Sequence, residues 1–391
     1  MSGAPDRLLV IFSDFEMGTG GPSDDYLDGA AFGELVASYA NGRSGGLPID
    51  LIFNGDTFEL LKTSHDGGYP HLVSAEVALD KMGRVADAHA PFFEGLRAFL
   101  STAGPAREVH FVAGNHDAEL LFPEVQGLVR ERCGGGAAVR FPGLEMEAGR
   151  VHVEHGSQLD PLFRMDPARP FITHRGRRLL NLSWGAVALL EVVIPINPVL
   201  YHLDRLRPKA VLFRLVPELK ELLTTAFWSY WTRDFWRDYL RGDDPLKTVS
   251  VPMLRELAWR LTSWSADVAL SDALERRMAA TGRHDLCVVG HVHQPAHRSY
   301  GRRAVIHTGA MRDEFLLSED GSAQTALPKT WAEVLLAGGE VAGARLVEQA
   351  APPRPPGAQP ESISAIRPRV RELLASLTAA RAGTARLAQG A

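Results

Sequence analysis

Short runs of apolar residues recur along the chain, and each run is followed by a small group of polar residues. The runs cover residues 8–12, 49–53, 109–112, 150–154 and 286–289. They are rich in Val, Ile, Leu and Phe and give way to Gly, Asn or other polar residues, so they predict buried β-strands. Residues 304–307 predict one more strand that completes the sheet, and residues 340–348 another.

The polar groups after the five strands contain seven side chains of metal-binding type: Asp14, Glu16, Asp56, Asn115, His155, His291 and His293. In open α/β sheets, ligands gather beyond the carboxyl ends of the strands, so one shared site is the economical interpretation. The set mixes carboxylate, amide and imidazole donors and has no cysteine pair at zinc-ligand spacing, which suits Mn²⁺, Fe or Zn²⁺. Seven ligands are too many for one tetrahedral ion. Two ions roughly 3.5 to 4 Å apart, sharing one carboxylate, would use them all and would hydrolyse a phosphate ester or anhydride.

Five motifs occur in a fixed order: Asp14-x-Glu16, Gly55-Asp56, Gly114-Asn115-His116-Asp117, His155-Gly156 and Gly290-His291-x-His293. This ordered set resembles the calcineurin-like metallophosphoesterase family over residues 8–310. The resemblance implies an α/β fold of the four-layer α+β type, in which two packed mixed β-sheets are flanked by helices and the dimetal site lies at the strand ends.

The same resemblance implies roles for single residues. Four side chains would hold the first ion (Asp14, Glu16, Asp56 and His293), and four would hold the second (Asp56, Asn115, His155 and His291), with Asp56 as the bridge. His116 would contact the phosphate and protonate the leaving oxygen, and Asp117 beside it is the second catalytic candidate. A metal-activated hydroxide would attack phosphorus without a covalent enzyme intermediate.

Glu16 departs from the family pattern, which has histidine at this position. A carboxylate still binds a metal but adds negative charge and favours harder ions, so the expected cofactor is a pair of divalent ions with Mn²⁺ first and Mg²⁺, Fe or Zn²⁺ as alternatives. Two other outcomes stay open: a water-bridged ion at Glu16, or a weakly occupied first site. The neighbouring Asp24 and Asp25 are interpreted as part of a solvated loop, with a supporting acceptor behind the metal ligands as the alternative.

Each motif taken alone has a simpler interpretation. Asn115, His116 and Asp117 suit a turn with a helix cap, and His155 suits an ordinary strand end. Two imidazoles two residues apart, as in His291 and His293, are a moderate metal signal by themselves. The order of all five motifs is the feature that favours a site over these alternatives.

The composition agrees with an enzyme that has a substantial core. The chain has 391 residues, 45% of them hydrophobic, and a formal net charge of -5, which gives no nucleic-acid signal. Its two cysteines, Cys133 and Cys287, are too few for a disulfide scaffold. No basic segment followed by an apolar one opens the sequence, so a cytoplasmic location is expected, with peripheral membrane attachment as an addition to it.

The motif order predicts five segments. Residues 1–159 and 281–350 would form the two parts of the catalytic core, 160–280 a largely helical insertion or cap, 351–363 a Pro-rich linker, and 364–391 a C-terminal helix and tail. The insertion opens with a basic run whose Arg164, Arg175 and Arg178 are candidates for binding substrate phosphate. Leu179 to Leu203 is strongly apolar, but two prolines and a glutamate argue against a membrane-spanning helix.

Aromatic residues crowd the segment 227–239, where Arg233 and Arg237 lie among them. The simpler interpretation is a helix with a large aromatic core face, and the alternative is a cap that faces lipid. This arrangement, together with residues 55–59, is similar to UDP-2,3-diacylglucosamine hydrolases within the family, which suggests a lipid-type substrate. The expected partners are therefore a phosphorylated small molecule or lipid and, through the insertion, a membrane surface. The last helix would dock on the body, form a homodimer or lie on a membrane.

These patterns lead to three candidate functions. The leading one is a dinuclear metallophosphohydrolase that acts on an amphipathic or lipid-linked phosphate or diphosphate. The second is a phosphodiesterase of the same chemistry for soluble nucleotides. The third is a non-catalytic metal-binding relative in which Glu16 has spoiled the first metal site.

Overall fold

The computed structural model describes residues 3–21, 24–42, 44–242, 244–247, 249, 251, 253–255, 267–352 and 361–389. The chain divides into two compact units. Unit 1 consists of Met1–Ala186, Ser250–Arg312 and Pro328–Pro352, and unit 2 consists of Val187–Val249, Asp313–Leu327 and Pro353–Ala391. The segment 160–280, predicted as one insertion, therefore contributes residues to both units.

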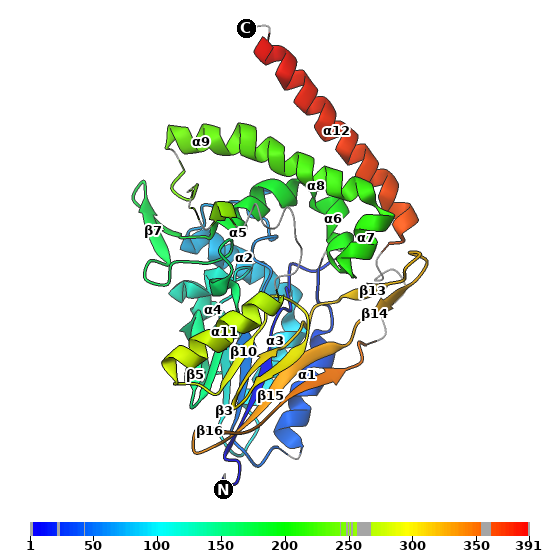
Figure 1. Ribbon diagram of the computed structural model, residues 1–391. Helices are drawn as coiled ribbons and strands as arrows, with labels where there is room; N and C mark the ends of the chain where they lie inside the picture. Colours follow the sequence, from blue (N-terminus) through cyan, green and yellow to red (C-terminus); the bar gives the residue numbers. More distant parts are fainter. Residues whose placement is uncertain are drawn as a thin grey trace. The chain divides into compact units, whose positions relative to one another are not determined.

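Unit 1 is built on two mixed β-sheets (Figure 1). The six-stranded sheet contains, in spatial order, β16 (Glu340–Gln349), β15 (Lys329–Ala337), β1 (Arg7–Phe12), β2 (Ile49–Asn54), β3 (Arg107–Val112) and β4 (Val139–Gly143). The five-stranded sheet contains β11 (Ala296–Tyr300), β12 (Arg303–His307), β10 (Leu286–Val289), β6 (Val151–Glu154) and β5 (Glu145–Ala148). Strands β1 to β4 are parallel, as are β6, β10 and β12. Parallel strands end at the same edge of a sheet, so the loops after them meet there.

The two sheets pack face to face. Leu9 and Ile52 of the first sheet share one buried cluster with Val153 and Val288 of the second. On the outer side of the first sheet, Phe12 of β1 contacts Phe32 of α1 (Gly29–Asn41) with ring centroids 5.3 Å apart. Such edge-to-face pairs add to the stabilisation that burial already provides.

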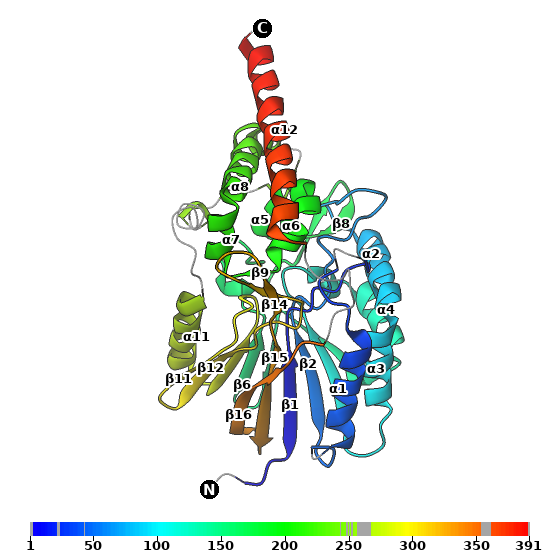
Figure 2. The same cartoon turned by 90° about the vertical axis from the view of Figure 1, so that its right-hand side faces the viewer.

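Helices cover both outer faces (Figure 2). On the first sheet, α1 packs beside α3 (Ala90–Leu100), and α2 (Ala75–Ala88) lies beside α4 (Pro123–Cys133). On the second, Leu270, Leu274 and Met278 of α11 (Asp267–Thr281) pack against Cys287 and Val289. The order helix, sheet, sheet, helix confirms the four-layer α/β architecture that the sequence predicted.

All seven apolar runs that predicted strands lie in strands of these sheets. Strand β15 was not anticipated, although it pairs with β1 on one side and β16 on the other. Its core sequence, Trp-Ala-Glu-Val-Leu-Leu-Ala, is rich in good helix formers. Pairing with two neighbouring strands overrides that local preference.

Unit 2 is mainly helical. It contains α6 (Asn197–Asp204), α7 (Lys209–Leu215), α8 (Pro217–Ser229), a π-helical turn (Tyr230–Phe235), α9 (Trp236–Arg241) and α12 (Ile363–Gln389). A small sheet joins β14 (Gln324–Ala326), β13 (Phe315–Leu317) and β9 (Leu206–Arg207). Helix α12 packs on α8, where Arg367 Nη2 and Arg371 Nε donate to Glu218 Oε1 at 3.0 and 2.7 Å. The predicted final helix is therefore present and docks on α8, while residues 353–360 of the predicted linker lie outside the described residues.

The segment predicted to be largely helical also contains strands. Strands β7 (Phe171–His174) and β8 (Arg177–Leu180) form a hairpin in unit 1, turned by Arg175 and Gly176, which both have positive φ. A two-residue turn of this kind fixes a hairpin locally, and the Arg-Gly pair was overlooked as its signal. The apolar stretch after it is divided into α5 (Trp184–Ala188), a π turn (Leu189–Val193), a 3₁₀ turn (Ile194–Ile196) and α6. Among the described helices, none combines the length and the apolar character that crossing a bilayer would need.

Candidate metal centre

The polar groups after the parallel strands of unit 1 form one cluster of loops held together by backbone hydrogen bonds. Glu16 N donates to Asp56 O at 2.9 Å, and Gly290 N donates to His155 O at 2.9 Å. The side chain of Asn54 joins the two sheets, because its Nδ2 donates to the carbonyls of Glu154 and Val288 at 2.8 and 3.2 Å. The loops that carry the predicted ligands are thus fixed to one another.

Five of the predicted ligands have left-handed backbone conformations. Their φ angles lie between 50° and 71° at Asp14, Glu16, Asp56, His291 and His293. This region costs a non-glycine residue roughly 1–2 kcal/mol, and such residues concentrate at functional sites. The repetition of this conformation across the loops of the cluster indicates that the loops are shaped to aim these side chains.

Asp56, His155 and His291 form a group whose ligand atoms all lie within 4.8 Å of one another. His155 Nδ1 donates to the carbonyl of Asn54 at 2.9 Å, which directs Nε2 towards Asp56 Oδ2, 3.0 Å away. A backbone acceptor that fixes the tautomer in this way is typical of metal-binding histidines. Burial alone would lower the pKa of His155, but the carboxylates of Asp56 and Asp14 raise it to about 9, so the group attracts a cation.

Buried acceptors without a hydrogen-bond partner provide a test of metal binding. Among the described residues these atoms include Asp14 Oδ1, Asn115 Oδ1 and His155 Nε2, each on a side chain that is 3% exposed or less. Leaving such an atom unpaired costs about 1–3 kcal/mol, and native structures rarely carry several in one place. Oxygen and imidazole acceptors that lack donors are the groups that a divalent cation would satisfy, so these residues fit the predicted metal.

Glu16 is already paired with side-chain cations. Arg312 Nη1 donates to its Oε1 at 2.5 Å, and Lys62 Nζ donates to its Oε2 at 3.2 Å. Burial opposes ionisation, yet these two cations hold the pKa of Glu16 well below its usual range. His293 Nε2 lies 3.4 Å from Glu16 Oε1 and 3.2 Å from Asp14 Oδ1, so three of the four ligands predicted for the first ion are brought together.

His116 is oriented by Glu59. Its Nδ1 donates to Glu59 Oε2 at 2.8 Å, and its backbone N donates to Asp56 Oδ1 at 2.7 Å. Although burial lowers the pKa of His116, the charges of Glu59 and Asp56 outweigh it and raise this pKa to about 10. The imidazole therefore holds a proton on Nε2, which is free of the Glu59 bond and available to a leaving oxygen.

Asp117 joins two loops. Its Oδ1 accepts from Gly114 N at 2.6 Å and its Oδ2 from Thr57 N at 2.7 Å. Burial and the Asp56 charge raise the pKa of Asp117 to about 7, while its backbone donors oppose the shift. Gly114 must lack a side chain, because a Cβ there would collide with Asp56.

The three candidate substrate arginines lie on the surface of unit 1. Arg164 is exposed and follows Phe163, whose ring centroid is 5.7 Å from that of His291. Arg175 forms the exposed turn of the β7–β8 hairpin, and Arg178 stacks its guanidinium 3.7 Å from the ring centroid of Phe171. Of the three arginines, Arg164 is thus the one next in sequence to a residue that contacts a predicted metal ligand, His291.

Four residues of this region were missed from the sequence as partners of the site: Glu59, Lys62, Asp160 and Arg312. Asp160 Oδ2 lies 3.2 Å from His291 Nε2. Asp24 and Asp25 are 2% and 3% exposed, so the solvated loop predicted for them is wrong. Lys62 Nζ pairs with Asp25 Oδ2 at 3.2 Å, and this pairing explains the burial. Arg312 follows the end of β12. The rule that ligands gather beyond strand ends, which identified the other site residues, would have included it as well.

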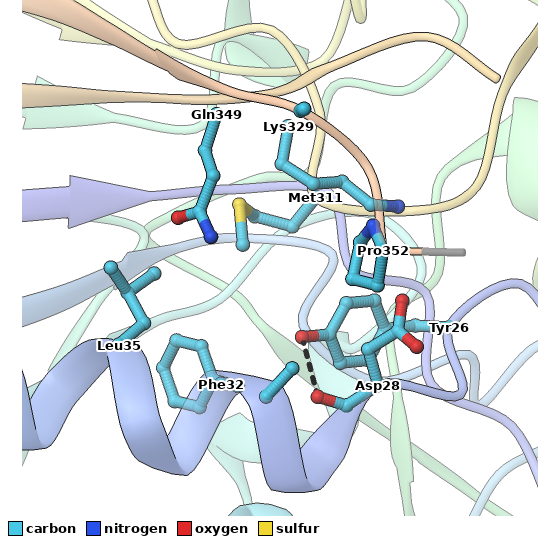
Figure 3. A pocket seen from close by; sticks show the side chains of 10 residues that line it. Tyr26, Asp28, Phe32, Leu35, Met311, Lys329, Gln349 and Pro352 are labelled. Carbon is cyan, nitrogen blue, oxygen red and sulfur yellow. Dashed lines mark hydrogen bonds between the residues drawn. The ribbon is translucent and has the colours of Figure 1, made fainter.

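A small pocket in unit 1 lies beside the segment that carries Arg312 (Figure 3). Tyr26, Met311 and Lys329 help to line it, and Tyr26 Oη donates to the Asp28 carbonyl at 3.2 Å. It offers about 20 Å³, roughly the space of one water molecule. The pocket is therefore too small for a substrate.

Comparisons with known proteins do not identify a function, so the functional assignment rests on the residues of the site. No family model and no curated protein matches the chain. Among solved structures, it is similar to Vacuolar Protein Sorting 29 from Cryptosporidium parvum (11% identity, TM-score 0.31, covering 89% of this chain and 100% of that one). It is also similar to a predicted phosphoesterase from Streptococcus pneumoniae (12%, 0.27, 89% and 100%) and to a putative 5'-nucleotidase from Staphylococcus aureus (13%, 0.34, 94% and 58%). Likenesses at this level carry no argument about function.

Proposed function

We propose that this chain is a metal-dependent phosphohydrolase that cleaves a phosphate ester or diphosphate bond. The observation that carries the proposal is the set of buried, unpartnered acceptors on Asp14, Asn115 and His155, close to a histidine that holds a proton. Asp56 and His291 lie with His155 and complete the proposed ligand set. A bound divalent ion supplies a Lewis acid for a phosphoryl oxygen and lowers the pKa of a water molecule.

The residues of the chain have separate tasks in this proposal. His116 donates the Nε2 proton to the leaving oxygen, and Glu59 orients the ring and stabilises the imidazolium. Asp117 fixes the loops of Gly114 and Thr57, which makes it a positioning residue. The Asn54 carbonyl accepts from His155 Nδ1, so Nε2 would be the nitrogen that holds the ion.

We propose further that the substrate is amphipathic, as a phosphorylated lipid is. Unit 2 supports this with a partly exposed aromatic face on α8 and α9, where Trp228, Trp236 and Tyr239 are 42%, 36% and 41% exposed. Leu240 is 78% exposed on α9, and Arg237 and Arg241 lie beside it. Indole and phenol rings with neighbouring basic side chains suit the boundary between water and acyl chains.

The test of the chemistry uses the full chain with aryl phosphate mono- and diesters, across Mn²⁺, Mg²⁺, Zn²⁺ and chelator. We expect turnover that chelator abolishes and that Asp56→Asn lowers by orders of magnitude. Asp66→Asn is the matched control, because Asp66 has the same backbone conformation (φ 49° against 50°) but an exposed side chain. Near-native turnover in Asp56→Asn, or turnover that survives chelator, would rule out the metal-dependent mechanism.

The test of the substrate class compares long-chain with short-chain phosphate esters, with and without detergent micelles. An amphipathic substrate predicts a preference for the long chain that falls when Trp228, Trp236 and Tyr239 are replaced together by alanine. Equal rates on both chain lengths, unaffected by that variant, would instead favour a soluble nucleotide or phosphodiester.

A further inference from the structure

The two predicted ion positions differ in how their ligands are satisfied. At the position of Asn115 and His155, a buried oxygen and a buried nitrogen have no hydrogen-bond partner. At the position of Glu16, both carboxylate oxygens accept from cations of the chain. The second position therefore already contains two fixed cations, Arg312 and Lys62, whereas the partner of Asp56 at the first position is a histidine.

Arg312 is buried beside Glu16 and is fixed there by its backbone. Its backbone N donates to Asp14 O at 2.8 Å, and its side chain is 2% exposed. Besides Glu16, its guanidinium faces the carboxylate of Asp25, whose Oδ2 lies 3.7 Å from Nη2. A metal that drew Glu16 away from Arg312 would weaken the pairing of a buried guanidinium, and removing a partner from a buried ion pair is strongly destabilising.

Lys62 occupies the space between three carboxylates. Its Nζ lies 2.9 Å from Glu59 Oε2, 3.2 Å from Glu16 Oε2 and 3.2 Å from Asp25 Oδ2. Glu16, Glu59 and His116 have ligand atoms that all lie within 4.8 Å of one another, a grouping that could hold a metal. The ammonium is already bonded to two of these three residues, so the chain supplies a cation of its own where a metal would otherwise be attracted.

We propose, on the basis of the function proposed above, that this chain binds one metal ion rather than two, and that Arg312 and Lys62 replace the ion at Glu16. The retained ion is held by Asp56, Asn115, His155 and His291. Asp14 Oδ1, a buried acceptor 3.2 Å from His293 Nε2, is assigned to the same ion. Glu16 then acts as a positioning residue that holds two fixed charges beside the catalytic group.

The experiment counts ions. The full chain is stripped with chelator, dialysed to equilibrium against Mn²⁺ and analysed for manganese, and its electron paramagnetic resonance spectrum is recorded. The expected result is about one ion per chain with the hyperfine pattern of an isolated Mn²⁺ ion. His155→Ala should then abolish binding, whereas a chain with two positions would retain one ion.

The variant Glu16→His with Arg312→Met tests the cause. Removing both the carboxylate and its guanidinium should admit a second ion, which would appear in the count and as exchange coupling in the spectrum. Arg107→Met is the matched control, because Arg107 is also buried (6% exposed) but donates to backbone carbonyls such as those of Leu47 and Gly45. It should leave the count unchanged.

The outcomes separate this inference from the function on which it rests. Two coupled ions in the wild-type chain, with chelator-sensitive turnover, would overturn the single-ion inference and leave the phosphohydrolase intact. A count that stays at one in a folded double variant would overturn the role of Arg312. No bound ion and no turnover in the wild-type chain would remove both proposals together.

Discussion

Two clusters of buried charge, one in each unit, differ in how their polar atoms are paired. In unit 2, Lys247 is 3% exposed, and its Nζ pairs with Asp238 Oδ2 at 2.7 Å and Glu191 Oε2 at 2.9 Å. In unit 1, acceptors of Asn115 and His155 are as deeply buried and have no partner. Satisfied buried charge serves the fold, whereas unsatisfied acceptors in a strained loop cluster indicate a ligand.

The largest expected effect concerns His116. Replacing it with alanine should lower turnover by about 10²–10⁴-fold, because the leaving oxygen loses its proton donor. Metal content should stay unchanged, since His116 is outside the proposed ligand set. His297→Ala, at an exposed histidine of β11, is the control and should keep full activity.

This prediction would fail in either of two ways. A His116→Ala chain that retains most of its turnover would show that another group protonates the leaving oxygen. A variant that loses its metal together with its activity would instead place His116 among the ligands.

A second prediction uses two glycines with similar backbones. Gly55 and Gly67 have φ of 80° and 76°, but a Cβ at Gly55 would collide with the His155 ring, whereas open space surrounds Gly67. Both alanine variants should lose about 1 kcal/mol of stability through backbone strain. Gly55→Ala should in addition lower Mn²⁺ affinity by about 10–100-fold, as is typical when support of a metal ligand is disturbed.

Isothermal titration with Mn²⁺ and thermal unfolding of the two variants separate these effects. If both variants bind Mn²⁺ as the parent does, His155 is not a ligand, and the unit 1 cluster loses its contrast with the one around Lys247.

The smallest effect is expected in unit 2, where Lys247→Met should lower the free energy of unfolding by about 1–3 kcal/mol, because Asp238 and Glu191 lose the buried ammonium that they share. Burial lowers the pKa of Lys247, but its bonds to Asp238 and Glu191 raise it above 10.5 overall. The stabilisation is therefore complete at neutral pH and is lost only as the pH rises through that raised value. Urea unfolding between pH 7 and pH 11 measures it.

Metal affinity should not change in Lys247→Met, and exposed Lys220→Met on α8 should change neither quantity by more than about 0.5 kcal/mol. If the Lys247 variant lost its metal, the unit 2 cluster could not be called purely structural, and the contrast with the unit 1 cluster would be contradicted.

The sequence predicted the sheets of unit 1 well because each core strand is a continuous apolar run. It also found the proposed ligands, since Asp14, Asp56 and His155 each directly follow such a strand or lie within two residues of its end. Strand β15 escaped prediction because its residues favour a helix in isolation, and only pairing with β1 and β16 decides its conformation.

The pairing within the site could not be predicted in the same way. Lys62 and Arg312 are 250 positions apart in the sequence, and nothing local indicates that both reach Glu16. Asp25 was interpreted as solvated because acidic residues in loops usually are, and only the folded chain places Lys62 beside it. Motif order identifies the polar residues at each strand end, but it does not identify which charges neutralise one another.

The left-handed backbone conformations in the loop cluster affect how the chain should respond to selection for stability. They occur at Asp14, Glu16, Asp56, His291 and His293. Glycine would adopt these angles without steric cost, so the side chains at these positions are kept at the expense of backbone strain. Such strain is expected where the side chains bind a ligand. Laboratory evolution for thermal tolerance, without an activity screen, should accumulate substitutions at His291 before Glu16, because losing Glu16 would weaken the pairing of buried Arg312.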